Sequence, residues 1–280
     1  MRIFSLAVLL GAGAVGLMTA SLRADVSLYD SGGFDLDTRF SPTFVNGSEP
    51  SVQGNLRGQD GGAWYYRGAN TSTSTQASAQ VITTAEGPNL SPQQSVQVTR
   101  SGGDGEWAPM LNYTATGMTV KVTWAMDLAS FASASLLGPF MGIDGYSGSV
   151  TRLGGAGIDA STGEFLFEDP AFGGGFNINA ADTVIGLGWH QWEIDYNFST
   201  QTYSASVDGT TEVSGVSFLI PAATVFSDAD IATLQNVPPA DLSNTGTAYF
   251  DNYAVSAVPE PTSLGAALLG VIGCLHRRRK

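Results

Sequence analysis

The sequence predicts an all-β sandwich. Three observations support this: short segments that alternate apolar and polar residues, clusters of Gly, Asp, Asn and Ser between them, and little helical periodicity. A βαβ protein would instead alternate its strands with amphipathic helices. The length of 280 residues is enough for one large sandwich domain, although length alone would also allow two.

The first half of the chain contains five segments with strand character. Gln94–Arg100 is the clearest, because Val96 and Val98 alternate with Gln97 and Thr99. The five predicted strands are Val26–Tyr29, Ala63–Arg67, Ala79–Thr84, Gln94–Arg100 and Met118–Met126.

The middle of the chain predicts a hairpin, in which Gly157–Asp159 and Glu164–Phe167 flank a turn that contains Gly163. Further strands are expected at Phe140–Ile143, Val150–Leu153 and Thr247–Ser256. One segment, Ser227–Leu234, has helical signals: Ser227 can cap, two aspartates suit the N-terminal end, and a proline follows at 238.

The segment Trp189–Gly209 reads WHQWEIDYNFSTQTYSASVDG. Its apolar residues Trp192, Ile194, Tyr196 and Phe198 share one strand face, and the acids share the other. A tryptophan-histidine strand, a turn and a strand ending in Asp208-Gly209 resemble the laminin-G-like members of the concanavalin-type jelly rolls, as does the closing Tyr249–Tyr253. The resemblance implies a jelly-roll β-sandwich and says little about function.

The N-terminus has the pattern of a secretory signal peptide. Arg2 precedes an apolar run from Ile3 to Met18, and small residues follow it. We expect cleavage after Ala24, so residues 1–24 would be absent from the mature protein.

The C-terminus, residues 258–280, combines three features in a fixed order. Pro259, Glu260 and Pro261 come first, an apolar run at 264–275 follows, and Arg277, Arg278, Arg279 and Lys280 close the chain. The apolar run is shorter than the ~20 residues that span a bilayer comfortably, and the basic residues would stay on the cytoplasmic side. The layout resembles the PEP-CTERM sorting signal, which an exosortase-type membrane protease recognises and removes; the alternative is an ordinary C-terminal anchor.

These predictions divide the chain into a signal peptide (1–24), a β-sandwich domain (25–257) and a sorting signal with a short helix (258–280). They imply an exported protein at the cell surface or outside the cell, anchored transiently in the inner membrane through 264–275 before the tail is removed.

The central domain is strongly acidic. The whole chain carries a formal net charge of −13, and half of its 12 basic residues lie in the two removable ends. Such a domain repels phosphate backbones, so we expect no nucleic acid partner. The one cysteine, Cys274, lies in the tail, which excludes a disulfide within the domain.

Glu193-Ile194-Asp195 is the strongest enzymatic signal. Laminarinase-type glucanases carry Glu-x-Asp and a further Glu on one strand face, where two carboxylates can hydrolyse a glycoside. Here Asn197 occupies the next position on that face, His190 lacks a Gly-x-Ser-x-Gly partner, and no Cys/His metal spacing occurs. We therefore expect a protein that is not an enzyme.

Calcium is a candidate cofactor, because aspartates in glycine-containing loops can converge on a hard cation. The metal ligands are not assigned. The aspartates in such loops are Asp35, Asp37, Asp60, Asp104, Asp144 and Asp159.

Aromatic side chains could form a platform for a sugar ring, whose faces are apolar. Trp64 and Tyr66 share a strand face that suits the core, so Tyr65 should point the other way. Tyr65 and Trp107 are the candidate ligand contacts. The sequence predicts a surface or matrix protein that associates with extracellular polysaccharide; the alternatives are a purely structural or adhesive domain and, third, a laminarinase-like glycoside hydrolase.

Overall fold

The computed structural model describes residues 25–34, 39–44, 55–66, 77–84, 87–88, 93–131, 138–148, 151–173, 175–178, 183–235 and 245–259. These residues belong to one compact unit, Asp25–Glu260. Among them, no helix is long and apolar enough to cross a membrane. The predicted signal peptide and the apolar run of the tail lie outside the described residues.

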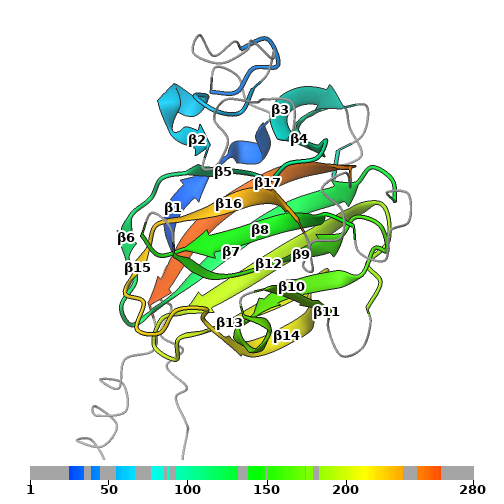
Figure 1. Cartoon of the computed structure of the whole chain (residues 1–280). Coiled ribbons are helices and arrows are strands. Elements are labelled where there is room, and N and C mark those ends of the chain that lie inside the picture. Colours follow the sequence, from blue (N-terminus) through cyan, green and yellow to red (C-terminus); the bar gives the residue numbers. More distant parts are fainter. Residues whose placement is uncertain are drawn as a thin grey trace, which may run out of the picture. The chain divides into compact units, whose positions relative to one another are not determined.

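Two antiparallel sheets pack face to face as a jelly-roll sandwich, which confirms the predicted fold class (Figure 1). Sheet A has eight strands, with β1 (Val26–Asp30) pairing to β17. The other strands, in spatial order, are β14 (Thr210–Ser217), β13 (Thr202–Val207), β12 (Trp189–Asn197), β7 (Met118–Leu128), β17 (Gly246–Pro259), β4 (Gln93–Arg100) and β3 (Ala77–Thr84).

Sheet B has seven strands. In spatial order they are β11 (Gly175–Ile178), β10 (Phe165–Asp169), β9 (Arg152–Asp159), β8 (Phe140–Tyr146), β16 (Asp228–Leu234), β5 (Gly105–Pro109) and β2 (Trp64–Tyr66). A small ribbon joins β15 (Val225–Phe226) to β6 (Tyr113–Thr114), and the 3-10 turns are η1 (Gly32–Phe34), η2 (Asp60–Gly62) and η3 (Pro170–Phe172).

The core lies between the sheets and follows the predicted alternation. Trp192, Ile194 and Tyr196 of β12 are buried at 0–2% exposure. The Trp192 ring stacks on Trp124 of β7 at 5.7 Å and on Phe165 of sheet B at 5.8 Å, so it joins the two layers. Period-two alternation therefore places one face of each strand in the core.

The predicted helix at Ser227–Leu234 is wrong, because Asp228–Leu234 forms β16. This strand lies between β8 and β5 and pairs with both. Its alternation turns Ala229 and Ile231 into the core and Asp228 and Asp230 to the opposite face. Cross-strand hydrogen bonds on both sides outweigh the local capping signals.

Sheet B differs from sheet A because its central strands β8 and β16 are buried on both faces. Every residue of β8 and β16 is buried, whereas β12 alternates buried with half-buried or exposed residues. The face of sheet B that points away from the core carries charged side chains. This outer face is the unexpected feature of the fold.

Candidate functional site

The two predicted ligand contacts lie on opposite faces of sheet B. Trp107 belongs to β5, not to a loop, and its side chain joins the core at 3% exposure beside Tyr66. Its ring is therefore not available to a surface ligand, which corrects that expectation. Tyr65 points to the outer face as expected, and its hydroxyl donates to Asp228 Oδ2 at 2.6 Å.

Glu193 and Asp195 lie on the outer face of sheet A, on one strand face as predicted. Lys121 Nζ lies 2.9 Å from Glu193 Oε2 and 4.0 Å from Asp195 Oδ1. Burial raises the pKa of Asp195, and the Lys121 charge opposes that shift. Asn197 uses its side chain to accept the turn N–H groups of Ser199 and Thr200. The arrangement is an ion pair between neighbouring strands.

The aspartates proposed as calcium ligands do not converge among the described residues. Asp60 accepts from Tyr29, Asp104 accepts from the Gln235 N–H, and Asp159 accepts from Gly138, Ser161 and Thr162. Asp144 lies within β8, not in a loop. No group of three acidic, histidine or cysteine side chains within the described part of the chain has metal-binding geometry. Asp35 and Asp37 lie outside the described residues.

The outer face of sheet B holds a group of side chains that the sequence analysis missed. We define the acid cluster as Glu106, Asp144, Tyr146, Arg152 and Glu168, which come from β5, β8, β9 and β10. These four strands of sheet B bring the residues together from distant parts of the chain.

A sequence signal for the acid cluster does exist. Glu168 follows Phe167, whose side chain is in the core, so alternation turns Glu168 outward. The same reasoning applies to Asp144 after Ile143. Placing Asp144 in a loop and β16 in a helix hid the pattern.

Arg152 connects the members of the cluster. Its Nη1 donates to Glu168 Oε1 at 2.5 Å, and its Nε donates to the Tyr146 hydroxyl at 3.0 Å. The same Nε lies 3.6 Å from Asp144 Oδ2, beyond hydrogen-bond distance. Tyr146 in turn donates to Glu106 Oε1 at 2.5 Å. The Arg152 guanidinium thus bonds to one carboxyl group and one tyrosine hydroxyl and lies beside a second carboxyl group.

Gly155 provides the room in which Asp144 lies. A Cβ atom at Gly155 would overlap Asp144 Oδ1 and would lie 2.6 Å from the Ile143 carbonyl oxygen. Asp144 pairs with Gly155 across β8 and β9, so its carboxyl group rests over the bare backbone of the neighbouring strand. Position 155 therefore requires glycine, because the Asp144 carboxyl group lies too close for a side chain.

Burial dominates the electrostatics of the cluster. Asp144 and Glu168 are both 0% exposed, and burial raises the pKa of each. The charge of Glu168 raises the pKa of Asp144 further, whereas Arg152 lowers that of Glu168 through its charge and its hydrogen bond. Asp144 is therefore the member that holds a proton more readily.

The Asp144 carboxyl group needs a bound proton to form a hydrogen bond. Among the described residues, no N–H or O–H group donates to either of its oxygens. A proton on Asp144 would give one of its oxygens a hydrogen bond to Glu168. Two adjacent carboxyl groups that share one proton form an acid and a base side by side.

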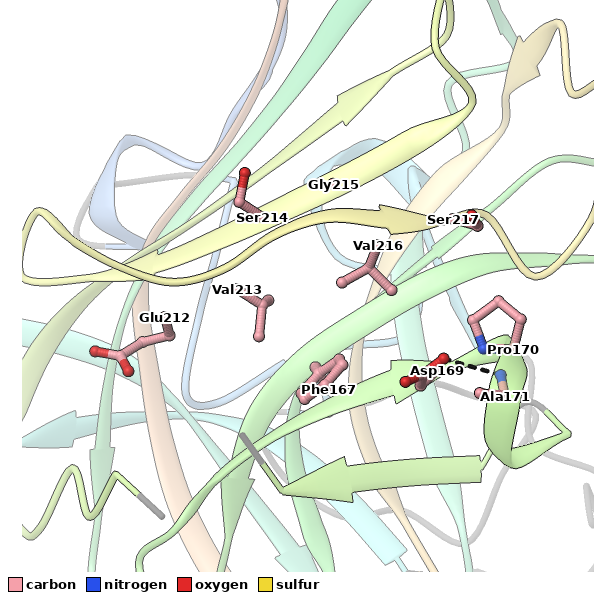
Figure 2. Close-up of a pocket in the computed structure, with 10 residues that line it drawn as sticks. All are labelled: Phe167, Asp169, Pro170, Ala171, Glu212, Val213, Ser214, Gly215, Val216 and Ser217. Carbon is pink, nitrogen blue, oxygen red and sulfur yellow. Dashed lines mark hydrogen bonds between the residues drawn. The ribbon is translucent and has the colours of Figure 1, made fainter. Parts of the chain in front are cut away.

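An open groove lies at the edge of the sandwich, between β14 of sheet A and β10 with η3 of sheet B (Figure 2). Its volume is about 590 Å³. Figure 2 shows Val213 and Val216 pointing from β14 toward Phe167 on β10. Glu212, Asp169 and Ser217 add hydrogen-bonding groups to the lining.

Local sequence explains both walls of the groove. Asp169 caps η3 by accepting from Ala171 N at 2.8 Å, with Pro170 at the first position of the turn. On the other wall, the pairing of β14 shifts register, and Gly215 adopts φ +69°. This irregularity lets both Val213 and Val216 pack against the core.

The match to known proteins is clearest at the C-terminus. The description "PEP-CTERM protein-sorting motif" matches residues 257–280. The chain ends in a PEP-CTERM sorting motif. This motif confirms the predicted sorting signal, and it indicates export and exosortase-dependent sorting to the extracellular space. Of its Pro-Glu-Pro triplet, Pro259 is described and ends β17.

No curated protein matches the chain. Solved structures do match, at low identity. A sialidase shares 12% identity with a TM-score of 0.49, over 82% of this chain and 19% of its own. The cellulose-induced protein Cip1 shares 13%, with a TM-score of 0.47 over 70% and 91% of the two chains. Alginate lyase AlgAT5, from polysaccharide lyase family 7, shares 13%, with a TM-score of 0.47 over 79% and 95%.

This comparison corrects one expectation. A protein that is not an enzyme was expected from the broken Glu-x-Asp pattern, but matched structures are named as a sialidase and as alginate lyases. The expectation of a protein without enzymatic activity is therefore wrong. The chain covers only 19% of the sialidase, and the likeness itself describes the fold alone.

Proposed function

We propose that this protein is an exported surface protein that associates with an extracellular polysaccharide through the groove of Figure 2. Residues 1–24 would act as the signal peptide, and an exosortase-type protease would remove the segment after the Pro-Glu-Pro triplet. The observation that carries the proposal is the mixed lining of an open groove.

The lining suits a sugar chain because a pyranose ring has apolar C–H faces and a polar rim. Val213, Val216 and Phe167 offer an apolar surface, and Glu212 and Ser217 offer hydrogen-bonding groups at its margin. The groove has no Lys or Arg in its lining, and the chain carries a net charge of −13. Both features favour a neutral polysaccharide over a polyuronate such as alginate.

A binding experiment tests this proposal. The purified exported protein is applied to an array of neutral and acidic polysaccharides, and its affinity is then measured for the polysaccharides that it binds. Val216→Ala and Glu212→Ala should each weaken binding by about tenfold, equivalent to ~1.4 kcal/mol. Binding should change little with salt, because the ligand is uncharged.

Glu193→Ala is the matched control, since it removes a carboxylate from the outer face of sheet A. It should bind like the parent. Equal binding by the groove variants would contradict the groove as the site. A parent protein that binds no polysaccharide would favour the structural or adhesive alternative.

A further inference from the structure

We propose that the protein has a second site for a neutral sugar, in an open hollow over β4 and β17, and that its two sites together cross-link polysaccharide chains. The hollow has a volume of about 400 Å³ and is lined by Phe131 and by several hydroxyl side chains. We call it the polar hollow, and its hydroxyl-bearing residues are Thr99, Ser101, Ser130, Thr245 and Thr247. The sugar class rests on the proposed function; the site rests on the lining of the hollow itself.

The polar hollow forms where three neighbouring strands of sheet A have their ends. β4 ends at Arg100, β17 begins at Gly246, and β7 ends at Leu128. β17 lies between the other two strands. Just after β7, the Ala129 N–H donates to the carbonyl oxygen of Thr247 at 3.0 Å. The residues that follow β4 and β7 therefore meet those that precede β17 at one end of the sheet.

The hydroxyl groups of the polar hollow suit an uncharged ligand that is rich in hydroxyl groups. Thr99 and Thr247 pair across β4 and β17, and their Oγ1 atoms lie 3.2 Å apart. A hydroxyl group both donates and accepts hydrogen bonds, so this pair can turn to match the hydroxyl groups of a sugar.

The charge of the lining excludes the other ligand classes. Among the described residues that line the polar hollow, Arg100 is the one with a charged side chain. Its side chain is fully buried, and its Nη2 lies 3.3 Å from Asp104 Oδ1. Because this charge is paired and out of contact with solvent, the lining favours a neutral ligand over an anion or a cation.

Phe131 supplies the apolar surface that a sugar ring also needs. Its side chain is 44% exposed and lies close to Gly163, in the turn between β9 and β10. A Cβ atom added at Gly163 would lie 2.6 Å from Phe131 Cε1 and 3.4 Å from Val184 Cγ1. Phe131 and Val184, which is 58% exposed, therefore form an apolar rim beside the hydroxyl groups. An aromatic face next to hydrogen-bonding groups is the combination that a pyranose ring requires.

The polar hollow and the groove are too far apart to hold the same sugar residue. The groove includes β14, and four strands, β13, β12, β7 and β17, lie between β14 and β4. Neighbouring strands are about 4.8 Å apart, so these five spacings separate the two sites by roughly 24 Å across the sheet. Two such sites on one protein bind two polysaccharide chains, or two distant parts of one chain.

Two sites give the protein a function that a single groove does not have. A protein bound to one chain through the groove presents the polar hollow to a second chain, and so joins the two. Binding to one long chain through both sites is also tighter than binding through either alone, so the loss of either site weakens it.

Calorimetric titration counts the sites. The purified exported protein is titrated with a short oligosaccharide prepared from the polysaccharide that it binds on the array. The parent should bind two oligosaccharides per chain. Phe131→Ala should weaken one of these binding events by about tenfold, and Val216→Ala should weaken the other.

Thr247→Val tests the hydroxyl groups with almost no change in size. It should weaken binding at the polar hollow by roughly 2- to 12-fold, the effect of one hydrogen bond. Thr83→Val is the matched control, because Thr83 is an exposed threonine on β3 of the same sheet. It should bind both oligosaccharides like the parent. Thermal melting checks that each variant folds, and Thr247→Val decides if Phe131→Ala does not fold.

Light scattering tests the cross-linking. When the parent is added to the intact polysaccharide, scattering should rise, and it should fall again when protein in excess occupies each chain separately. Phe131→Ala and Val216→Ala should each abolish the rise while still binding the oligosaccharide at the remaining site.

The outcomes separate this inference from the proposed function. A parent that binds one oligosaccharide per chain, with no effect of Phe131→Ala or Thr247→Val, overturns the polar hollow and leaves the groove standing. Binding that responds to Phe131→Ala but not to Val216→Ala supports the polar hollow and contradicts the groove. Two binding events without a rise in scattering overturn the cross-linking. A parent that binds no polysaccharide overturns both proposals.

Discussion

At the scale of single residues, the most informative position is a glycine. Gly155 has no unusual role in its own strand, but its missing side chain lets the Asp144 carboxyl group lie over β9. Because the Asp144 carboxyl group of β8 can lie over the backbone of β9, it can approach Glu168 on β10. The position of the Asp144 carboxyl group therefore depends on the missing Cβ atom of Gly155.

Gly155→Ala should destabilise the protein by roughly 1–3 kcal/mol, because the added Cβ would overlap Asp144 Oδ1 and crowd the Ile143 carbonyl. Urea unfolding measures the change. Gly246→Ala is the control, since its Cβ would meet only side-chain atoms at 3.1 Å or more. A Gly155 variant as stable as the control would show that the carboxyl group can move freely.

At the scale of elements, the same rule of alternation has different consequences in the two sheets. In β12 it separates a buried face from a face that carries Glu193 and Asp195 toward solvent. In β8 and β16 both faces are buried, so alternation places acids out of the core without exposing them. Asp144 and Glu168 in sheet B are therefore fully buried, whereas Glu193 in sheet A is partly exposed and paired with Lys121.

Neighbouring positions of β12 test this alternation. Ile194 is 0% exposed, so Ile194→Asp should leave little soluble folded protein, because a buried charge without a partner costs more than about 4 kcal/mol. Glu193→Gln, one residue away on the other face, should change the free energy of unfolding by roughly 0.5 kcal/mol or less. Soluble yield and urea unfolding measure both. A stable Ile194→Asp variant would refute the assignment of faces.

At the scale of the whole molecule, several acidic side chains lie together on the buried outer face of sheet B. Next to the acid cluster, β16 pairs Asp230 with Asp144 and Asp228 with Tyr146, and the Tyr65 hydroxyl of β2 donates to Asp228. Arg152 supplies the positive charge in the cluster. Such an arrangement makes the stability of the fold depend on protonation.

The sign of that dependence follows from the raised pKa values of Asp144 and Glu168. In the unfolded chain these groups titrate near ~3.9 and ~4.3, so the folded protein holds more protons above that range. Their stabilisation is fully present below the unfolded pKa values and is lost as pH rises through the folded ones.

The free energy of unfolding should therefore be lower at pH 7.5 than at pH 5, measured by urea unfolding at both. Asp144→Asn should flatten the difference, because an amide does not titrate. A parent whose stability rises between these pH values would contradict a shared proton in the cluster.

The sequence by itself determined the sandwich, the faces of β12 and the sorting motif, because each depends on local order: alternation, turn residues, or a triplet followed by an apolar run and basic residues. The tertiary structure alone decided the acid cluster. Its members lie far apart in sequence on β5, β8, β9 and β10, and strand order brings them together. The tertiary structure also decided the conformation of β16. Its local signals indicate a helix, but pairing with β8 and β5 makes it a strand. Local pattern fixes which way a side chain points, but only pairing between distant strands fixes what it meets.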